Sequence, residues 1–316
     1  MADAPRRHDM ASAALIALDW GTTSLRAWLL DEAGQVLDRQ QSREGILSVP
    51  AGGFIAVFEA ILSPWRTNSD PLPAIACGMV GSRQGWREAP YAPCPCAAVD
   101  LQHKLARVAA GASDLVIVPG VAFDPGGQPP DVMRGEETQV FGALAGSELS
   151  ATFVLPGTHS KWVTAEQGRI TRFATYMTGE VFDVLRRHSI LGRTMSDGVV
   201  RPDNASFIDG VEAGLNGGSG LLHRLFEVRS LALFDRLSAL DGQSYLSGLL
   251  IGSEIAGARE TATGDHPPVT LIGAPDLVAA YRTALHIAGI AAEVADLEVT
   301  PQGLWRIAVA AGMIGR

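Results

Sequence analysis

Apolar residues in the first half of the chain come in short runs, separated by turns rich in glycine and small polar residues. Three consecutive runs near the N-terminus predict a three-stranded meander whose first strand is buried, at residues 14–20, 25–31 and 35–41. After the meander, segments with helical spacing and short apolar runs follow. Helices are predicted at 53–63 and 137–147, and buried strands at 73–78 and 116–120. This order is typical of an α/β domain.

The second half of the chain begins in the same way. An apolar run at 152–157 is followed by a polar turn and by a segment at 161–175, in which Gly168 predicts a hairpin. Helical patterns then occupy three segments, at 181–191, 207–231 and 245–260. A predicted strand at 268–273 leads into two final helices, at 275–289 and 301–315.

Because the strand and turn pattern occurs twice, near residues 14 and 152, we predict two related α/β domains with a boundary close to 148–151. Residues 1–11 are expected to form a disordered tail. The N-terminal domain is predicted to cover 12–149 and the C-terminal domain 150–316, with the last helix packing back toward the first domain.

Composition narrows the class of protein. With 316 residues, 47% of them apolar and 19% charged, the chain is large enough for two well-packed domains and is not disordered. Its net charge of −9 argues against a nucleic-acid partner. The three cysteines lack a CxxC spacing, and neither a membrane span nor a signal peptide is evident. We expect a cytoplasmic enzyme with reduced thiols.

The turn after the first strand has the composition of a phosphate-binding loop. Asp19 ends the buried run, and Gly21, Thr22, Thr23 and Ser24 follow it. Such a turn presents backbone N–H groups and hydroxyls to phosphate oxygens. A carboxylate at this strand end can hold Mg²⁺ through water, because the ion prefers oxygen ligands. The alternative is an ordinary hairpin with a capping aspartate.

A similar turn opens the second half. Gly157 and Thr158 follow a buried strand there, and Lys161, one of only two lysines in the chain, lies just beyond them. Two such turns, each opening a three-strand unit, resemble the phosphate-1 and phosphate-2 loops of the actin-like ATPase superfold, which sugar kinases, actin and heat-shock chaperones share. The resemblance implies two ribonuclease-H-like α/β domains with an interdomain active-site cleft, and ATP and Mg²⁺ as cofactors.

That superfold also implies an adenosine loop. The segment 269–285 resembles one, because a strand is followed by Gly273, Ala274 and then a helix whose N-terminus would face the nucleotide. Any strand and helix unit would give the same local pattern, so its position after both phosphate loops carries the assignment. The helices that connect the two domains in this superfold would lie near 137–147 and 303–315.

Phosphoryl transfer to an alcohol requires a carboxylate that accepts the hydroxyl proton. In sugar kinases of this superfold an acidic residue precedes the helix before phosphate-2, and here Glu136 and Glu137 follow Gly135 at that place. Relatives usually have aspartate there, so the choice between the two glutamates stays open. Glu136 is favoured because it is next to the loop, whereas Glu137 could serve the helix dipole.

A glycine-rich loop after a buried strand supplies candidates for substrate binding: Ser82, Arg83, Gln84 and Trp86. An arginine among glycines is suited to hold a carboxylate through two hydrogen bonds, although a surface arginine is the simpler explanation. Together with RGEETQ at 134–139 and PGTHSKW at 156–162, GSRQGW at 81–86 resembles the 2-dehydro-3-deoxygalactonokinase family over residues 14–315.

This resemblance implies transfer of the ATP γ-phosphate to the 6-hydroxyl of 2-dehydro-3-deoxy-D-galactonate. An acidic substrate in an acidic protein needs local cations, which Arg83, Arg134 and Lys161 offer from three loops. His159 would bind substrate or phosphate, or be a polar loop residue. Thr178 and Gly179 would line the sugar pocket, while Glu180 would be a first-turn helix charge.

Several alternatives stay open. Another sugar or sugar acid could be the substrate, and a hydrolase of the polyphosphate-cleaving kind or a filament-forming ATPase could share the superfold. A pocket that reads hydroxyl groups is needed to distinguish the galactonate-derived from the gluconate-derived keto acid, and the sequence does not show that pocket. A homodimer is the default expectation for such an enzyme.

Overall fold

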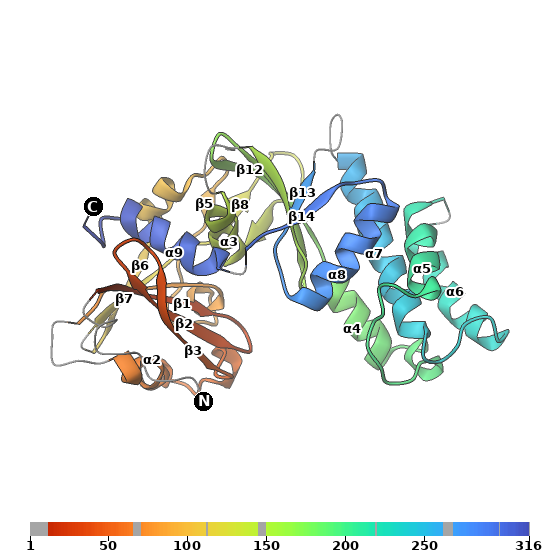
Figure 1. Cartoon of the computed structure of the whole chain (residues 1–316), viewed down its shortest axis with the longest axis horizontal. Coiled ribbons are helices and arrows are strands. Elements are labelled where there is room, and N and C mark those ends of the chain that lie inside the picture. The colour runs from red at the N-terminus through yellow and green to blue at the C-terminus, as the bar shows by residue number, and fades with distance from the viewer. Residues whose placement is uncertain are drawn as a thin grey trace. The chain divides into compact units, whose positions relative to one another are not determined.

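The computed structural model describes residues 12–65, 71–111, 113–144, 150–218, 220–261, 268–296 and 298–315. The predicted tail at 1–11 lies outside these ranges. The chain divides into two compact units. The first comprises residues 1–150, 165–172 and 296–316, and the second comprises 151–164 and 173–295. Figure 1 traces the elements along the chain from red to blue.

The first unit is built on a six-stranded sheet in the order β3-β2-β1-β4-β7-β6. Its strands are β1 (Ala13–Trp20), β2 (Leu25–Asp31), β3 (Val36–Ser42), β4 (Ala74–Cys77), β6 (Ala106–Ala110) and β7 (Ser113–Ile117). β1, β2 and β3 pair antiparallel, as the meander prediction requires, whereas β4 pairs parallel to both β1 and β7. The central strand β4 is buried throughout, which explains its unbroken apolar sequence.

Helix α2 (Phe54–Leu62) contributes Phe58 to the apolar core of this sheet, where Trp20 is also fully buried. The sequence did not predict β6, nor a three-stranded sheet of β5 (Ala92–Pro93), β8 (Val121–Phe123) and β9 (Asp131–Met133). These strands have two to five residues, too few for an alternating pattern to be distinct. Short 3-10 helices occupy Ile46–Ser48, Ser63–Trp65, Met79–Gly81 and Ala98–Lys104.

Two helices cross in the first unit, α3 (Glu136–Ala143) and α9 (Val299–Ala310). Their contact depends on glycine: a Cβ on Gly142 would lie 1.8 Å from the Val299 carbonyl oxygen, and one on Gly303 would lie 1.9 Å from that of Thr138. The predicted last helix starts two residues earlier than expected, at Val299, and ends at Ala310. The end of the other predicted helix, at 145–147, lies outside the described residues.

The second unit repeats the strand order of the first in a five-stranded sheet, β12-β11-β10-β13-β14. Its strands are β10 (Ala151–Leu155), β11 (Ser160–Glu166), β12 (Arg169–Tyr176), β13 (Val269–Leu271) and β14 (Ala292–Val294). β13 pairs parallel to both β10 and β14, as β4 does to β1 and β7. The hairpin turn predicted at Gly168 is present, with a positive φ of 74°.

Five helices accompany this sheet: α4 (Thr178–His188), α5 (Ala205–Leu215), α6 (Leu221–Leu233), α7 (Gly242–Thr261) and α8 (Pro275–Ile287), with a 3-10 turn at Gly192–Thr194. The expectation of one helical segment at 207–231 was wrong. The chain turns between α5 and α6, where Gly217 and Gly220 have positive φ angles of 53° and 77°. Helical periodicity on both sides hid this break.

Helices α5 and α7 cross closely because glycines face each other at the crossing. A Cβ on Gly210 would lie 2.3 Å from the Tyr245 carbonyl oxygen, and one on Gly248 would lie 2.2 Å from that of Phe207. Asn204 caps α5, since its side-chain oxygen accepts a hydrogen bond from the Phe207 N–H. The crossing positions α7 beside the cavity described below. None of the described helices is long and apolar enough to cross a membrane.

Candidate functional site

The predicted phosphate-1 loop forms the turn between β1 and β2. The Gly21 N–H donates to the Ser24 carbonyl oxygen at 2.9 Å, which closes the turn. Thr22, Thr23 and Ser24 are exposed, so their hydroxyls are available to a ligand. The segment around Gly45 packs against this turn, since a Cβ on Gly45 would lie 2.3 Å from the Thr23 nitrogen.

Asp19 lies near the end of β1, beside strands β2 and β4 of the first unit. Its carboxylate forms an ion pair with Arg26, its cross-strand neighbour on β2. The Cys77 Sγ, at the end of β4, lies 4.0 Å from Asp19 Oδ1. Burial raises the pKa of the Cys77 thiol, and the charges of Asp19 and Glu137 raise it further. Asp19, Cys77 and the start of α3 thus belong to one electrostatic neighbourhood.

Glu136 and Glu137 differ in their surroundings. Glu137 is fully buried, and its two carboxyl oxygens accept hydrogen bonds from the Gly135 N–H at 2.7 Å and the Thr138 hydroxyl at 2.9 Å. Burial, followed by the charge of Glu136, raises the pKa of Glu137 to about 8. Glu136 is only partly buried and accepts from the Arg134 N–H at 3.0 Å. Glu136 can therefore meet a ligand at the helix start, whereas Glu137 is enclosed.

The side chains of the predicted substrate loop at 82–86 do not all face the same surface. The Arg83 side chain is 85% exposed, and its Nε donates to Glu88 at 3.1 Å. Gln84 is exposed as well. The Trp86 ring instead packs into the core, stacked on Phe54 with ring centroids 5.8 Å apart. Trp86 thus fixes the loop to the core of the first unit.

Arg134, which directly follows strand β9, packs beside this loop. Its Nη2 donates to the Ala89 carbonyl oxygen at 2.8 Å, and its guanidinium lies over the Tyr91 ring, 4.5 Å from the centroid. A Cβ on Gly81 would lie 3.0 Å from Arg134 Nη1 and 2.9 Å from Ile117 Cγ2, so a larger residue there would crowd the guanidinium. Within the described residues, the buried Nε and Nη1 of Arg134 and the buried Oγ of Ser82 have no hydrogen-bond partner.

The predicted phosphate-2 loop lies against the start of α4. A Cβ on Gly179 would lie 2.3 Å from the Gly157 carbonyl oxygen, and the Glu180 N–H donates to the Thr158 carbonyl oxygen at 2.9 Å. His159 Nε2 and Glu180 Oε2 are 2.5 Å apart, with both side chains about half exposed. Glu180 is therefore a partner of the loop histidine as well as a first-turn helix charge.

Lys161 does not point to a surface. It is buried, and its Nζ donates to the Thr175 Oγ1 of β12 at 2.9 Å. The neighbours of Lys161 on β11, Ser160 and Trp162, face the opposite side of the strand and contact Glu254. This burial gives a structural reason for one of the two lysines in the chain.

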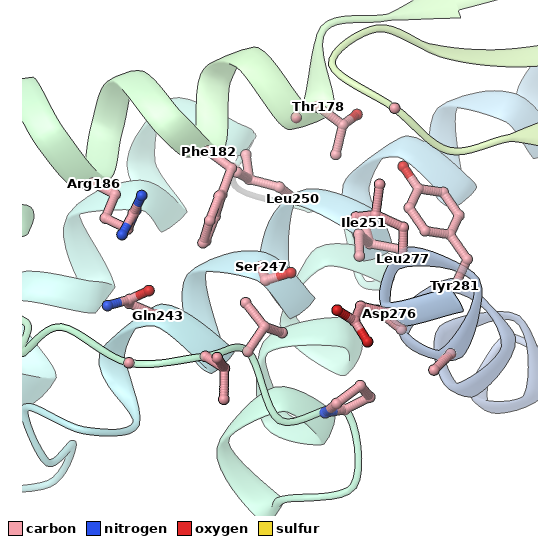
Figure 2. Close-up of a pocket in the computed structure, with 18 residues that line it drawn as sticks. Thr178, Phe182, Arg186, Gln243, Ser247, Leu250, Ile251, Asp276, Leu277 and Tyr281 are labelled. Carbon is pink, nitrogen blue, oxygen red and sulfur yellow. The ribbon is translucent and has the colours of Figure 1, made fainter. Parts of the chain in front are cut away.

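A cavity of about 490 Å³ lies within the second unit, between α4, α7, α8 and the segment 198–202. This is the size of a site for a small organic ligand, about 300–1,000 Å³. Figure 2 shows Thr178 and Tyr281 at one end of it, Arg186 and Gln243 at the other, and the Phe182 ring between them. Gly157 and Gly179 also line it, so the phosphate-2 loop borders the cavity.

The predicted adenosine loop leads into the same cavity. Ala274 directly precedes α8 and Pro275 is its first residue. Asp276 and Leu277, in the same first turn, belong to the cavity wall. A Cβ on Gly273 would lie 3.3 Å from the Pro156 carbonyl oxygen, so this loop and the phosphate-2 loop are neighbours. Gln243 donates through Nε2 to the Ser196 carbonyl oxygen at 2.6 Å, which fixes its amide.

Sequence reasoning missed the most extensively bonded carboxyl group of this region, Glu254 on α7. It accepts hydrogen bonds from Ser160 at 2.7 Å, Trp162 at 2.8 Å and Tyr281 at 2.6 Å, and also from Thr178. Burial raises its pKa, although these four bonds oppose the shift. A signal existed: Glu254 lies inside the mostly apolar part of the helical segment 245–260, whose other carboxyl group, Glu260, is at its end.

Comparison with known proteins shows to which family this chain belongs. The sequence profile of a family described as 2-keto-3-deoxy-galactonokinase matches residues 19–307, which include every loop described above. The chain belongs to this family. Both the family and the sugar-acid kinase resemblance that the loop motifs predicted are thereby confirmed.

Relatives and a solved structure cover nearly the whole chain. A Rhizobium meliloti protein named "Probable 2-dehydro-3-deoxygalactonokinase DgoK1" is 38% identical over 284 residues, 89% of this chain and 92% of the relative. An Escherichia coli K12 protein named 2-dehydro-3-deoxygalactonokinase is 36% identical over 280 residues, 88% and 91% of the two chains. A crystal structure of a protein assigned as a 2-dehydro-3-deoxygalactonokinase in Sinorhizobium meliloti has a TM-score of 0.87, with 37% identity over 94% of this chain and 98% of that chain.

The fold class agrees with the family. The two sheets repeat one strand order, which is the duplication expected of two ribonuclease-H-like domains of the actin-like ATPase superfold. The family member of known structure shares this fold over nearly its full length. The roles assigned to individual residues remain predictions.

Proposed function

We propose that this kinase transfers the γ-phosphate of ATP to the 6-hydroxyl of 2-dehydro-3-deoxy-D-galactonate. The observation that carries the proposal is the family match over residues 19–307. The reaction needs a nucleotide pocket, phosphate-binding loops, a base and cations for the acidic substrate, and the chain has candidates for each.

The cavity of the second unit is the proposed nucleotide pocket. Its lining is largely apolar around Phe182, Leu250 and Ile251, as a nucleobase requires, and it reaches Gly157 of the phosphate-2 loop. The nucleobase would lie toward Gln243 and the phosphates toward Gly157 and Thr158, whose backbone would hold the phosphates. Asp276, at the start of α8, would meet the ribose.

Asp19 is the proposed contact to Mg²⁺. Within the described part of the chain no group of three or more His, Cys, Asp or Glu side chains gathers around a metal-sized space. That suits Mg²⁺ in a kinase, which usually takes one or two protein carboxylates and otherwise water and phosphate oxygens. Asp19 is a partly exposed carboxylate at a strand end, so its chemistry fits. When bound, the ion would neutralise phosphate charge.

Glu136 is the proposed base. It would accept the proton of the 6-hydroxyl as the oxygen forms its bond to the γ-phosphorus, while the bond from that phosphorus to the bridging oxygen breaks and ADP leaves. Glu136 suits this role better than Glu137, because a base must reach the hydroxyl and Glu137 is enclosed at the helix start. Glu137 would position the Gly135 loop.

Arg134, Ser82 and Arg83 are the proposed contacts of the sugar-acid carboxylate. Arg134 and Ser82 together carry buried polar atoms without a partner among the described residues, and a carboxylate would satisfy them. Arg83 could join them only by leaving Glu88, an exposed ion pair that costs little to break. His159 and its partner Glu180 would contact phosphate or substrate beside the phosphate-2 loop.

We also propose a cytoplasmic location, in keeping with the unpaired thiols of Cys77, Cys94 and Cys96. A homodimer is proposed on general grounds, since two-fold dimers are by far the commonest of the symmetric oligomers that soluble proteins form. Light scattering of the purified protein measures that state directly.

The proposal is tested by coupled ADP release over a panel of six-carbon sugar acids. We expect turnover with 2-dehydro-3-deoxy-D-galactonate, weaker turnover with its gluconate-derived epimer, and no ADP release without an acceptor. Equal ADP release with and without sugar acid would instead identify a hydrolase. Preference for a different acid or for a neutral sugar would identify another kinase of the superfold.

A further inference from the structure

A buried carboxyl group connects the walls of the proposed nucleotide pocket, and the proposed chemistry does not use it. Glu254 belongs to α7 and is 3% exposed. Its Oε1 accepts from Ser160 and Trp162 of β11, and its Oε2 accepts from Thr178 of α4 and Tyr281 of α8. With two donors on each oxygen, the group is fully hydrogen-bonded without water.

The two oxygens face different parts of the second unit. The donors to Oε2, Thr178 and Tyr281, both line the cavity, and Figure 2 shows them at the same end of it. The donors to Oε1 come from the strand that directly follows the phosphate-2 loop, since Ser160 is the first residue of β11. Glu254 therefore ties the phosphate-2 strand to both helices that enclose one end of the cavity.

We infer that Glu254 is a positioning residue for nucleotide binding: it holds α4 and α8 at the separation that the nucleotide requires and fixes them to the phosphate-2 loop. This inference rests on the proposed nucleotide pocket. Glu254 itself does not line the cavity, so it would act only through Thr178, Tyr281 and Ser160. A buried group bonded to four side chains from three elements is costly to leave partly satisfied, which makes the geometry specific.

A glutamine at this position perturbs one side of the network selectively. The indole N–H of Trp162 can only donate, so the amide oxygen of a Glu254→Gln variant must stay on its side. The amide nitrogen then faces Thr178 and Tyr281, whose hydroxyls must accept from it instead of donating. The bonds to β11 are kept, while the two at the cavity wall reverse direction and two hydroxyl protons lose the acceptor that Glu254 gives them.

The test is steady-state kinetics of Glu254→Gln with each substrate varied in turn. We expect the KM for ATP to rise about fivefold or more, the effect of one or two hydroxyl donors left without an acceptor at the cavity wall. The KM for the sugar acid and the kcat at saturating ATP should stay within about twofold, because a residue that only shapes the nucleotide site alters binding rather than the chemical step. General destabilisation would not produce this split.

Two other variants make the result decisive. Glu227→Gln removes a carboxylate that accepts from Tyr245 in the same unit, and neither residue lines the cavity, so its ATP KM should equal that of the wild type. Ser247→Phe places a ring inside the cavity and should raise the ATP KM if the nucleotide binds there.

A normal ATP KM for Ser247→Phe would reject the nucleotide pocket, and the inference with it. A raised value for Ser247→Phe together with a normal value for Glu254→Gln would reject the inference alone. Should Glu254→Gln not fold, Tyr281→Phe decides, because it removes one donor and keeps the ring. Its ATP KM must rise at an unchanged sugar-acid KM, and a normal ATP KM would overturn the inference.

Discussion

At the scale of single residues, neighbours in the sequence have different environments in the fold. Glu136 and Glu137 are adjacent, but one is partly exposed and the other has no exposed surface. The sequence could predict that a carboxyl group is needed at this loop, since the reaction type requires one. It could not predict the burial of Glu137, because that depends on the close approach of Gly135 to Gly78, where a Cβ on Gly135 would lie 3.2 Å from the Gly78 Cα.

Exchanging the two glutamates for glutamine separates their roles. We expect Glu136→Gln to lower kcat by about 10²–10⁴, the usual contribution of a general base, with little change in the KM for ATP. Glu137→Gln should retain more of the activity, because the amide oxygen can still accept from the Gly135 N–H. The reverse order of kcat values would assign the base to Glu137.

The raised pKa of Glu137 predicts a pH dependence of stability. Its pKa is about 8 in the folded protein and near 4.5 when exposed, so the unfolded chain loses this proton first. The folded state is therefore penalised as pH rises from about 4.5 to 8, by at most about 1.4 kcal/mol per pH unit. Tm measured against pH should fall faster in the wild type than in Glu137→Gln over that window. Parallel curves would mean that Glu137 titrates normally.

Arginine variants test where the substrate carboxylate binds. Arg134→Lys should raise the KM for the sugar acid by about tenfold or more, because an ammonium cannot replace the planar guanidinium with its two unpartnered donors. Arg83→Lys should raise it less, since Arg83 is exposed and already paired with Glu88. Kinetics at saturating ATP measure both. A larger effect at Arg83 would move the carboxylate to the outer face of the loop.

At the scale of elements, sequence patterns predicted the long helices and buried strands well, but not the places where helices break or cross. The meander of β1, β2 and β3 follows from alternating runs and polar turns. The split between α5 and α6 did not, because apolar spacing continues on both sides of Gly217 and Gly220. Each glycine at the crossings of α3 with α9 and of α5 with α7 is explained only by the helix that packs against it. The sequence does not show which helices pack together.

The crossing of α3 and α9 predicts a costly substitution. Gly303→Ala places a Cβ 1.9 Å from the Thr138 carbonyl oxygen, so the two helices must separate. We expect a loss of about 1–3 kcal/mol in the free energy of unfolding, the usual range for overpacking. Urea denaturation measures it. Gly315→Ala is the control, since nothing lies within 4 Å of a Cβ there. Equal stability of the two variants would contradict this packing.

At the scale of the whole molecule, duplication was the feature that the sequence predicted best. Two loops of similar composition, each opening a three-strand unit, predicted two related domains, and the five strands of the second sheet follow the order of the first five strands of the six-stranded sheet. The family followed from motifs spread over both units. The cavity of the second unit was predicted only at its edges, because Phe182, Gln243 and Leu250 come from helices that carry no phosphate-loop motif.

The central claim, phosphorylation of one hydroxyl of one sugar acid, is tested most directly by identifying the product. Purified protein is incubated with ATP, Mg²⁺ and 2-dehydro-3-deoxy-D-galactonate, and the product is examined by proton and phosphorus NMR. The account predicts one phosphate ester at the 6-hydroxyl, formed in equal amount with ADP. Inorganic phosphate in place of the ester, or an ester at another position, would contradict it.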